Sequence, residues 1–182
     1  MSRLTLVVAT CFLLVSAQAQ AIASGHVRCT ISENGEGAQG TLRLSQNGRE
    51  LARGACGGDA LAIAPGDYVA VVQLDGALDG PEQQKSVTVH AGQTAEVSAA
   101  FATGTLEVRI QNDGRRAAGM ALIRRDGTQI GTLGSGVSAH LSAGTYDVIA
   151  RYRDQEQRFA GVVIKAGEKQ VIEVAFGSTA KQ

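Results

Sequence analysis

Residues 105–111 read Thr-Leu-Glu-Val-Arg-Ile-Gln, so that apolar and polar side chains alternate along the segment. Successive side chains of a β-strand point to opposite faces of a sheet, and this pattern therefore predicts a strand with one buried face. The same alternation recurs in residues 27–31 and 145–152. No window of about a dozen residues has its apolar residues at the spacing of an amphipathic helix. These segments favour an all-β fold.

The chain contains one unit twice. Residues 25–101 align with residues 104–176, with small gaps near residues 55 and 80. Each copy has two Asn-Gly or Asp-Gly pairs at matching places, which supply the positive φ angles of tight hairpins. These pairs are Asn34-Gly35, Asn47-Gly48, Asp113-Gly114 and Asp126-Gly127. A repeat of this length predicts two copies of a small domain, and the short linker Ala102-Thr103 predicts an elongated rod.

Turn signals divide each copy into about six or seven short strands, at spacings of about eight to twelve residues. This is the pattern of a small antiparallel β-sandwich. Residues 50–60 and 128–137 are the least strand-like parts, because glycine weakens a strand.

The second copy carries a recognisable order of motifs. It runs Gly-Thr-Leu-Glu-Val from residue 104, Arg-Arg-Asp-Gly from 124, Ser-Ala-Gly-Thr-Tyr-Asp-Val from 142, Val-Val-Ile-Lys-Ala-Gly from 162, and a closing strand over 171–176. This order resembles the carboxypeptidase regulatory-like and PEGA-type β-sandwich repeats of bacterial exported proteins. The resemblance covers both copies and implies Greek-key sandwiches, prealbumin-like or Ig-like, with no catalytic residues. It also implies a role as a spacer, a ligand-presenting module or an interaction domain.

The first residues have the features of a signal peptide. Arg3 precedes an apolar run over residues 4–15, and small residues allow cleavage after Ala19 or Ala21. The apolar run is shorter than a membrane-spanning helix requires, and Cys11 lies inside it and not at a lipidation point. The sequence thus predicts a signal peptide (1–21), two domains (25–101 and 104–176) and a tail (177–182). It predicts a periplasmic or secreted protein without membrane insertion after cleavage; an uncleaved anchor is the alternative.

The composition excludes some partners. The 17 Lys and Arg residues balance 17 Asp and Glu residues, and no basic stripe is present, which argues against nucleic acid as a partner. The chain has no Trp and few other aromatic residues. A chain poor in aromatic side chains and rich in small ones such as Ala and Val favours thin, strand-based cores over pockets for large flat ligands.

Cys29 and Cys56 are the two cysteines that follow the leader, and an even count in an exported chain predicts one disulfide. Cys29 aligns with Val108, and Cys56 aligns with Gly134 or Ser135. The bond would contribute about 3 kcal/mol through loop closure. A buried free pair or a metal role are the alternatives.

The sequence predicts neither a metal site, a cofactor nor a catalytic residue. His26, His90 and His140 lie on separate segments and face outward by strand parity, whereas zinc needs convergent ligands. Residues 75–80 read Asp-Gly-Ala-Leu-Asp-Gly, in which Ala77 interrupts the oxygen ligands that calcium requires, so we expect an extended hairpin loop. Neither a nucleophile elbow nor a phosphate-binding loop is present.

Arginines mark the second copy. Arg124, Arg125, Arg151 and Arg153 are candidates for contact with an anionic glycan or an envelope protein. Alternatively, they are exposed charges that prevent edge-to-edge aggregation.

We therefore expect a non-catalytic exported module, structural or binding, that recognises a protein or glycan at the cell envelope. Recognition would use the loops at the ends of the sandwich or the addition of a partner strand to an edge. The alternatives are a spacer or accessory subunit of a larger envelope assembly, and a small secreted enzyme or enzyme inhibitor.

Overall fold

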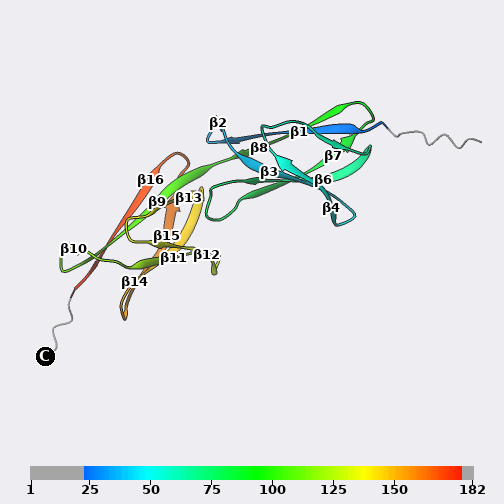
Figure 1. The fold of residues 1–182 in the computed structure, drawn as a ribbon. Coiled ribbons are helices and arrows are strands. Elements are labelled where there is room, and N and C mark those ends of the chain that lie inside the picture. Colours follow the sequence, from blue (N-terminus) through cyan, green and yellow to red (C-terminus); the bar gives the residue numbers. More distant parts are fainter. Residues whose placement is uncertain (1–22, 178–182) are drawn as a thin grey trace, which may run out of the picture.

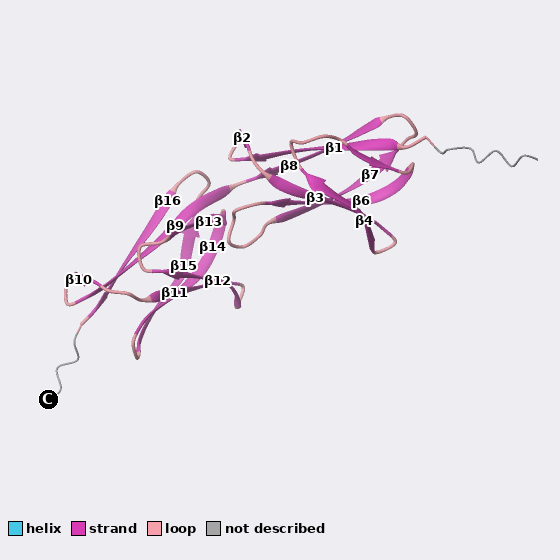
Figure 2. Ribbon diagram, viewed as in Figure 1, coloured by secondary structure: helices cyan, strands magenta, loops and turns pink. Residues whose placement is uncertain are grey.

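The structure is a computed structural model, and it describes residues 23–177. The predicted signal peptide and residues 178–182 of the predicted tail lie outside the described residues. Within the described range the chain forms strands and turns but no helix, which confirms the all-β class (Figure 2).

The first unit contains β1 to β8. Their bounds are β1 (Gly25–Glu33), β2 (Glu36–Gly37), β3 (Gly40–Gln46), β4 (Arg49–Ala55), β5 (Leu61–Ile63), β6 (Gly66–Leu74), β7 (Glu82–Val89) and β8 (Thr94–Phe101). The second unit contains β9 (Thr103–Asn112), β10 (Arg115–Arg116), β11 (Met120–Arg125), β12 (Thr128–Gly134), β13 (Ser138–Ser142), β14 (Gly144–Tyr152), β15 (Gln155–Ile164) and β16 (Lys169–Phe176). Strands β4 and β12 thus form where glycine made the sequence least strand-like.

Each unit is a sandwich of two four-stranded sheets. In the first unit one sheet has the order β4-β3-β6-β7, and the other is built around β1, which pairs with β2, β5 and β8. In the second unit the corresponding sheets are β12-β11-β14-β15 and β9 with β10, β13 and β16. Both units are mainly antiparallel, but the first and last strand of each pair in parallel, β1 with β8 and β9 with β16.

The parallel strand pairs determine how the chain runs through the two units. Because the first and last strands run in the same direction, the chain enters each unit at one end and leaves it at the other. Figure 1 shows the result: the start of β1 and the end of β16 lie at opposite ends of an elongated molecule. The linker is shorter than predicted, since Thr103 already belongs to β9 and Ala102 alone separates it from β8.

Each unit has its own hydrophobic core. The first includes Leu42, Leu44 and Val72, and the second includes Leu106 and Ile123, all at 1% exposure or less. At matching places in the two cores, a tyrosine hydroxyl donates to a backbone carbonyl four residues upstream. The pairs are Tyr68 to Ala64 O and Tyr146 to Ser142 O, each at 2.7 Å. Such tyrosine corners are typical of Greek-key sandwiches.

A disulfide joins Cys29 of β1 to Cys56, which directly follows β4, and this confirms the predicted pairing. The bond therefore crosslinks the two sheets of the first unit.

Candidate functional site

The two units contact each other through a joint that lies around the linker. We define the joint by Glu33, Asn34, Ala77, Leu78 and Asp79 of the first unit, and by Thr103, Arg125, Gly131, His140, Ser142 and Tyr146 of the second. Most of the first unit's contribution comes from residues 75–80, between β6 and β7. The sequence indicated an extended hairpin loop there, and the structure places that loop against the second unit.

Asp79 is the polar centre of the joint. Its side chain is only 6% exposed, and its two carboxylate oxygens accept hydrogen bonds from the Ser142 backbone N–H at 3.1 and 3.2 Å. The Tyr146 hydroxyl lies 3.0 Å from Asp79 Oδ2, and Arg125 Nη1 lies 3.5 Å from the same oxygen. A buried carboxylate needs such partners, because an unpaired buried charge is costly.

Tyr146 therefore takes part both in the joint, through Asp79, and in the tyrosine corner of its own unit, through Ser142. Its single hydroxyl proton can be donated to Asp79 or to the Ser142 carbonyl of the tyrosine corner, but not to both at once. Burial, together with the neighbouring Asp79 carboxylate, raises the pKa of Tyr146 to about 12. The hydroxyl thus stays protonated and able to donate at any physiological pH.

Leu78 gives the joint an apolar contact. Its side chain packs against the core of the second unit, directly over Gly131 of β12. A Cβ atom at Gly131 would lie 2.6 Å from the Leu78 side chain, so glycine is required for this close approach. The Leu78 backbone N–H also donates to the His140 carbonyl at 2.8 Å.

The other side of the joint involves the turn between β1 and β2. Asn34 Nδ2 donates to the Thr103 carbonyl at 2.9 Å, and the Thr103 N–H donates to Asn34 Oδ1 at 3.0 Å. Glu33 accepts a hydrogen bond from the Thr103 hydroxyl, and His140 Nδ1 lies 3.4 Å from Glu33 Oε1. His140 is exposed, as strand parity predicted, but it lies against the first unit.

The structure does not bring the four candidate arginines together. Arg125 belongs to the joint, and Arg124 precedes it in β11. Arg151 and Arg153 lie at the opposite end of the second unit, where Arg151 pairs with Glu156 at 2.8 Å and Arg153 lies over the Tyr152 ring. Arginine content alone did not reveal that two of the four have intramolecular partners of opposite charge.

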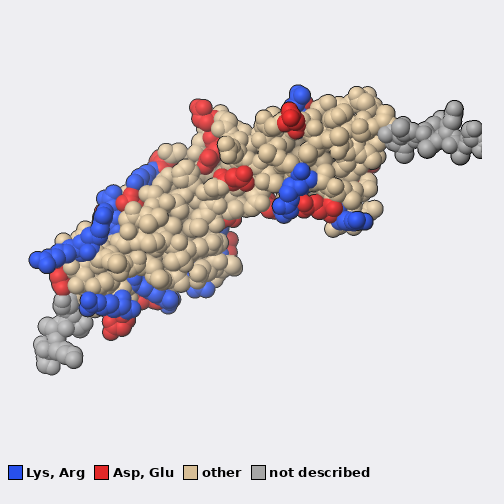
Figure 3. All heavy atoms as spheres, viewed as in Figure 1, with Lys and Arg blue, Asp and Glu red and all other residues tan. Residues whose placement is uncertain are grey.

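A hollow lies beside Arg124 on the outer face of the sheet β12-β11-β14-β15. It has a volume of about 210 Å³, and its lining includes Arg124, Asp147, Ile149 and Arg158. Arg124 Nε is buried and has no hydrogen-bond partner among residues 23–177. Figure 3 shows that Lys and Arg side chains gather mainly over the second unit.

The first unit has a hollow of about 300 Å³ at the aligned place, but its lining, which includes Ser45, Val69 and Thr88, contains no arginine. Its aligned residues are Ser45 for Arg124, Val71 for Ile149 and Gln84 for Arg158, from the same strand registers. The two arginines, and not the hollow itself, therefore distinguish the second copy from the first.

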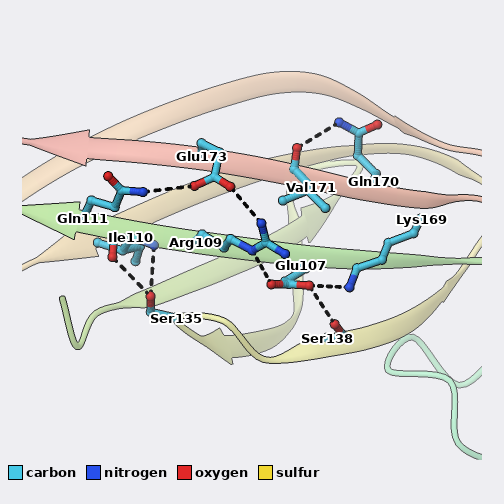
Figure 4. Close-up of polar contacts among 10 residues, drawn as sticks. All are labelled: Glu107, Arg109, Ile110, Gln111, Ser135, Ser138, Lys169, Gln170, Val171 and Glu173. Carbon is cyan, nitrogen blue, oxygen red and sulfur yellow. Dashed lines mark hydrogen bonds and ion pairs between the residues drawn. The ribbon is translucent and has the colours of Figure 1, made fainter. Parts of the chain in front are cut away.

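A second polar cluster connects strands β9, β13 and β16 of the second unit (Figure 4). Glu107 of β9, with a side chain only 8% exposed, accepts hydrogen bonds from Arg109, from Lys169 of β16 and from Ser138 of β13. Hydrogen bonds from Arg109 and then Lys169 lower the pKa of Glu107 to about 2. Both carboxylate oxygens are engaged, so this cluster stabilises the sheet.

Among residues 23–177, no three His, Cys, Asp or Glu side chains are grouped so that they could hold a metal ion. The same residues include no helix long and apolar enough to cross a membrane.

Comparisons with known proteins give structural similarities only. No family model matches the chain, and no curated protein matches it. Among solved structures, the chain is similar to the TIE protein of Bacillus anthracis (15% identity, TM-score 0.41), covering 85% of this chain and 34% of that one. It thus spans about a third of that protein's length.

Two further solved structures are matched over nearly the whole of their own length. GBS52, the minor pilin of Streptococcus agalactiae, shares 9% identity at a TM-score of 0.42, covering 88% of this chain and 98% of that one. A C-terminal fragment of the pilus adhesin SpaC from Lactobacillus rhamnosus GG shares 14% identity at a TM-score of 0.34, covering 87% and 99%. Such low similarities say nothing of what this chain binds, which depends on its own side chains.

Proposed function

We propose that the protein is a non-catalytic, exported structural and binding module: a stiff two-unit rod at the cell envelope, in which the first unit holds the second in a fixed orientation. The observation that carries the proposal is the burial of Asp79 of the first unit against Ser142, Tyr146 and Arg125 of the second. A flexible tether between two independent domains would need neither this carboxylate nor the apolar contact of Leu78.

Three features of the chain support stiffness. The linker is Ala102 alone, the parallel strand pairs place entry and exit at opposite ends of each unit, and the units are joined by two separate sets of contacts, one made by Asn34 and one by Asp79. Interfaces between domains permit relative motion unless they are well packed, and here the nearly buried Asp79 carboxylate and the Leu78 side chain fill the contact.

Export and a non-catalytic role belong to the same proposal. The Cys29–Cys56 disulfide supports an oxidising compartment, since such bonds persist in the periplasm and outside the cell. The nearly buried carboxylates of Asp79 and Glu107 are engaged by structural partners and so are not held ready for a substrate. Kinship with the carboxypeptidase regulatory-like or PEGA-type repeats is part of this proposal, supported by the shared order of turns and the tyrosine corners.

Small-angle X-ray scattering of the mature protein tests stiffness. We expect one extended conformation to account for the wild-type curve, and a wider distribution of sizes for Asp79→Ala. Asp75→Ala is the matched control, because Asp75 lies in the same loop and the one hydrogen bond of its carboxylate among residues 23–177 comes from Thr41 of its own unit. If the wild-type curve already requires an ensemble of bent forms, the proposal of a stiff rod is wrong.

The hollow beside Arg124 supports a second candidate role, the recognition of an acidic envelope protein. Arginines around an apolar floor are typical of the centre of protein interfaces. A photo-crosslinking residue at Leu122, which neighbours Arg124 on the outer face, should capture a defined partner in the native envelope. The aligned position in the first unit, Arg43, serves as the control, and equal capture from both positions, or capture of glycan alone, would contradict this role.

A further inference from the structure

Two turns of the first unit contain asparagine followed by glycine. Asn34-Gly35 connects β1 to β2, and Asn47-Gly48 connects β3 to β4. Both asparagines have positive φ angles, 51° and 53°. A Cβ atom at either glycine would meet no other atom within 4 Å, so both turns are open to solvent.

Asparagine followed by glycine can modify itself without an enzyme. The backbone nitrogen of the glycine attacks Cγ of the asparagine side chain, a C–N bond forms, and the side-chain nitrogen leaves as ammonia. Water then opens the resulting succinimide ring at either carbonyl, giving aspartate or isoaspartate. The net change is the addition of one water and the loss of one ammonia, and glycine favours it because no side chain shields its nitrogen.

The two asparagines differ in what their side chains hold. Asn34 Nδ2 donates to the Thr103 carbonyl at 2.9 Å and lies 3.3 Å from the Thr103 hydroxyl, across the joint. No hydrogen bond of the Asn47 side chain is found among residues 23–177. Before Asn34 can react, its amide must therefore leave Thr103, and the joint must open on that side.

The second unit shows that the product residue fits the turn. Asp113 and Asp126 occupy the places of Asn34 and Asn47, with φ angles of 50° and 49°. The Asp113 N–H donates to the Phe176 carbonyl just as the Asn34 N–H donates to the Phe101 carbonyl. Conversion to aspartate thus leaves the fold of each turn intact and changes only what the side chain contacts.

We propose that Asn34-Gly35 is a site of spontaneous deamidation that is protected by the joint and that, once modified, loosens it. This inference rests on the stiff joint of the proposed function. After the reaction an oxygen of the new carboxylate faces the Thr103 carbonyl in place of the donating NH₂, and a second negative charge lies beside Glu33. Two facing acceptors repel each other, so the contact that Asn34 made becomes unfavourable.

Peptide mapping by mass spectrometry tests the protection. The mature protein is kept in mildly alkaline buffer, and ammonia loss at each asparagine is followed over weeks. We expect Asn47 to convert roughly tenfold faster than Asn34, because releasing Asn34 from Thr103 requires breaking at least one net hydrogen bond. Asn112 should stay unmodified, because Asp113 and not glycine follows it.

Two variants separate this inference from the proposed function. In Asp79→Ala, Asn34 should convert faster while Asn47 keeps its rate; an unchanged Asn34 rate, or equal rates at both sites in the wild type, would contradict protection by the joint. Asn34→Asp should broaden the size distribution in scattering, whereas the matched Asn47→Asp should not. If Asn34→Asp stays as stiff as the wild type, deamidation does not loosen the joint, but the proposal of a stiff rod still stands. If neither Asn34 nor Asn47 converts, the proposal of spontaneous deamidation is wrong.

Discussion

Ser135 of the second unit occupies the place that Cys56 occupies in the first. The Cys56 N–H donates to the Gly40 carbonyl at 2.8 Å, and the Ser135 N–H donates to the aligned Gly119 carbonyl at 3.0 Å. Where the first unit has a disulfide, the Ser135 hydroxyl accepts a hydrogen bond from the Ile110 N–H at 2.9 Å. The same corner of one fold is therefore closed covalently in one copy and by a hydrogen bond in the other.

Replacing the disulfide by the residues of the second unit should destabilise the first. The variant Cys29→Val/Cys56→Ser removes a crosslink between residues 27 apart in sequence, and loop-closure entropy then favours the unfolded chain by about 3 kcal/mol. Urea unfolding of the mature protein, followed by near-UV circular dichroism, measures the loss. Reduced wild type should match the variant; an oxidised wild type no more stable than the variant contradicts a stabilising bond.

The reverse exchange should create a second disulfide. Val108 and Ser135 have the sequence separation of the native pair, and the N–H of Gly136 bonds to the Val108 carbonyl just as that of Gly57 bonds to the Cys29 carbonyl. We expect Val108→Cys/Ser135→Cys to oxidise fully, with no thiol labelled in the unfolded, unreduced protein. Val108→Cys/Gly134→Cys is the control, shifted by one residue, and it should keep two free thiols. Equal oxidation of both variants would show that the corners are not equivalent.

Local patterns predicted the strands, because alternation and turn residues act over a few positions, and the even count of cysteines after the leader predicted the disulfide. The alignment left Cys56 opposite either Gly134 or Ser135, and backbone hydrogen bonds decide for Ser135. The joint could not be predicted in this way, since it depends on how two units meet. Its one signal was the insertion around residues 75–80, which the second copy lacks.

The Glu107 cluster shows the same limit. Strand parity places Glu107 on the outer face of β9, where a glutamate is expected to be exposed. It is buried instead because β16 runs parallel to β9 and brings Lys169 alongside, from more than sixty residues away in the chain.

Glutamine side chains should protect the free edges of β8 and β16 from strand addition. Gln83 donates to the Ala100 carbonyl, and Gln157 donates to the Ala175 carbonyl at 2.7 Å, so that side chains from the facing sheet cover edge acceptors. Edge strands with unpaired backbone groups tend to associate. We expect the free energy of unfolding of Gln83→Ala/Gln157→Ala to lie within about 1 kcal/mol of the wild-type value. The variant should nevertheless form dimers or larger species.

Analytical ultracentrifugation over a concentration series measures that association. Gln84→Ala is a suitable control, since Gln84 alternates with Gln83 on β7 and pairs in register with Val71 on the outer face. A strictly monomeric double variant would show that these glutamines do not guard the edges.

Glu107→Gln should lose stability at neutral pH but not in strong acid. Hydrogen bonds from Arg109 and Lys169 lower the pKa of Glu107 from 4.5 to about 2, so the folded state binds this proton more weakly than the unfolded state. The charged carboxylate therefore contributes its full stabilisation above pH 4.5, and this contribution fades as the pH falls through about 2. Thermal unfolding at a series of pH values should show a lower midpoint for the variant than for the wild type at pH 7, and this difference should close toward pH 2.

Glu173→Gln provides the comparison, because Glu173 is half exposed and shares Arg109 with Glu107, so its removal should change the midpoint little at any pH. A gap for Glu107→Gln that is independent of pH would mean that packing, and not the ionised carboxylate, holds β9, β13 and β16 together.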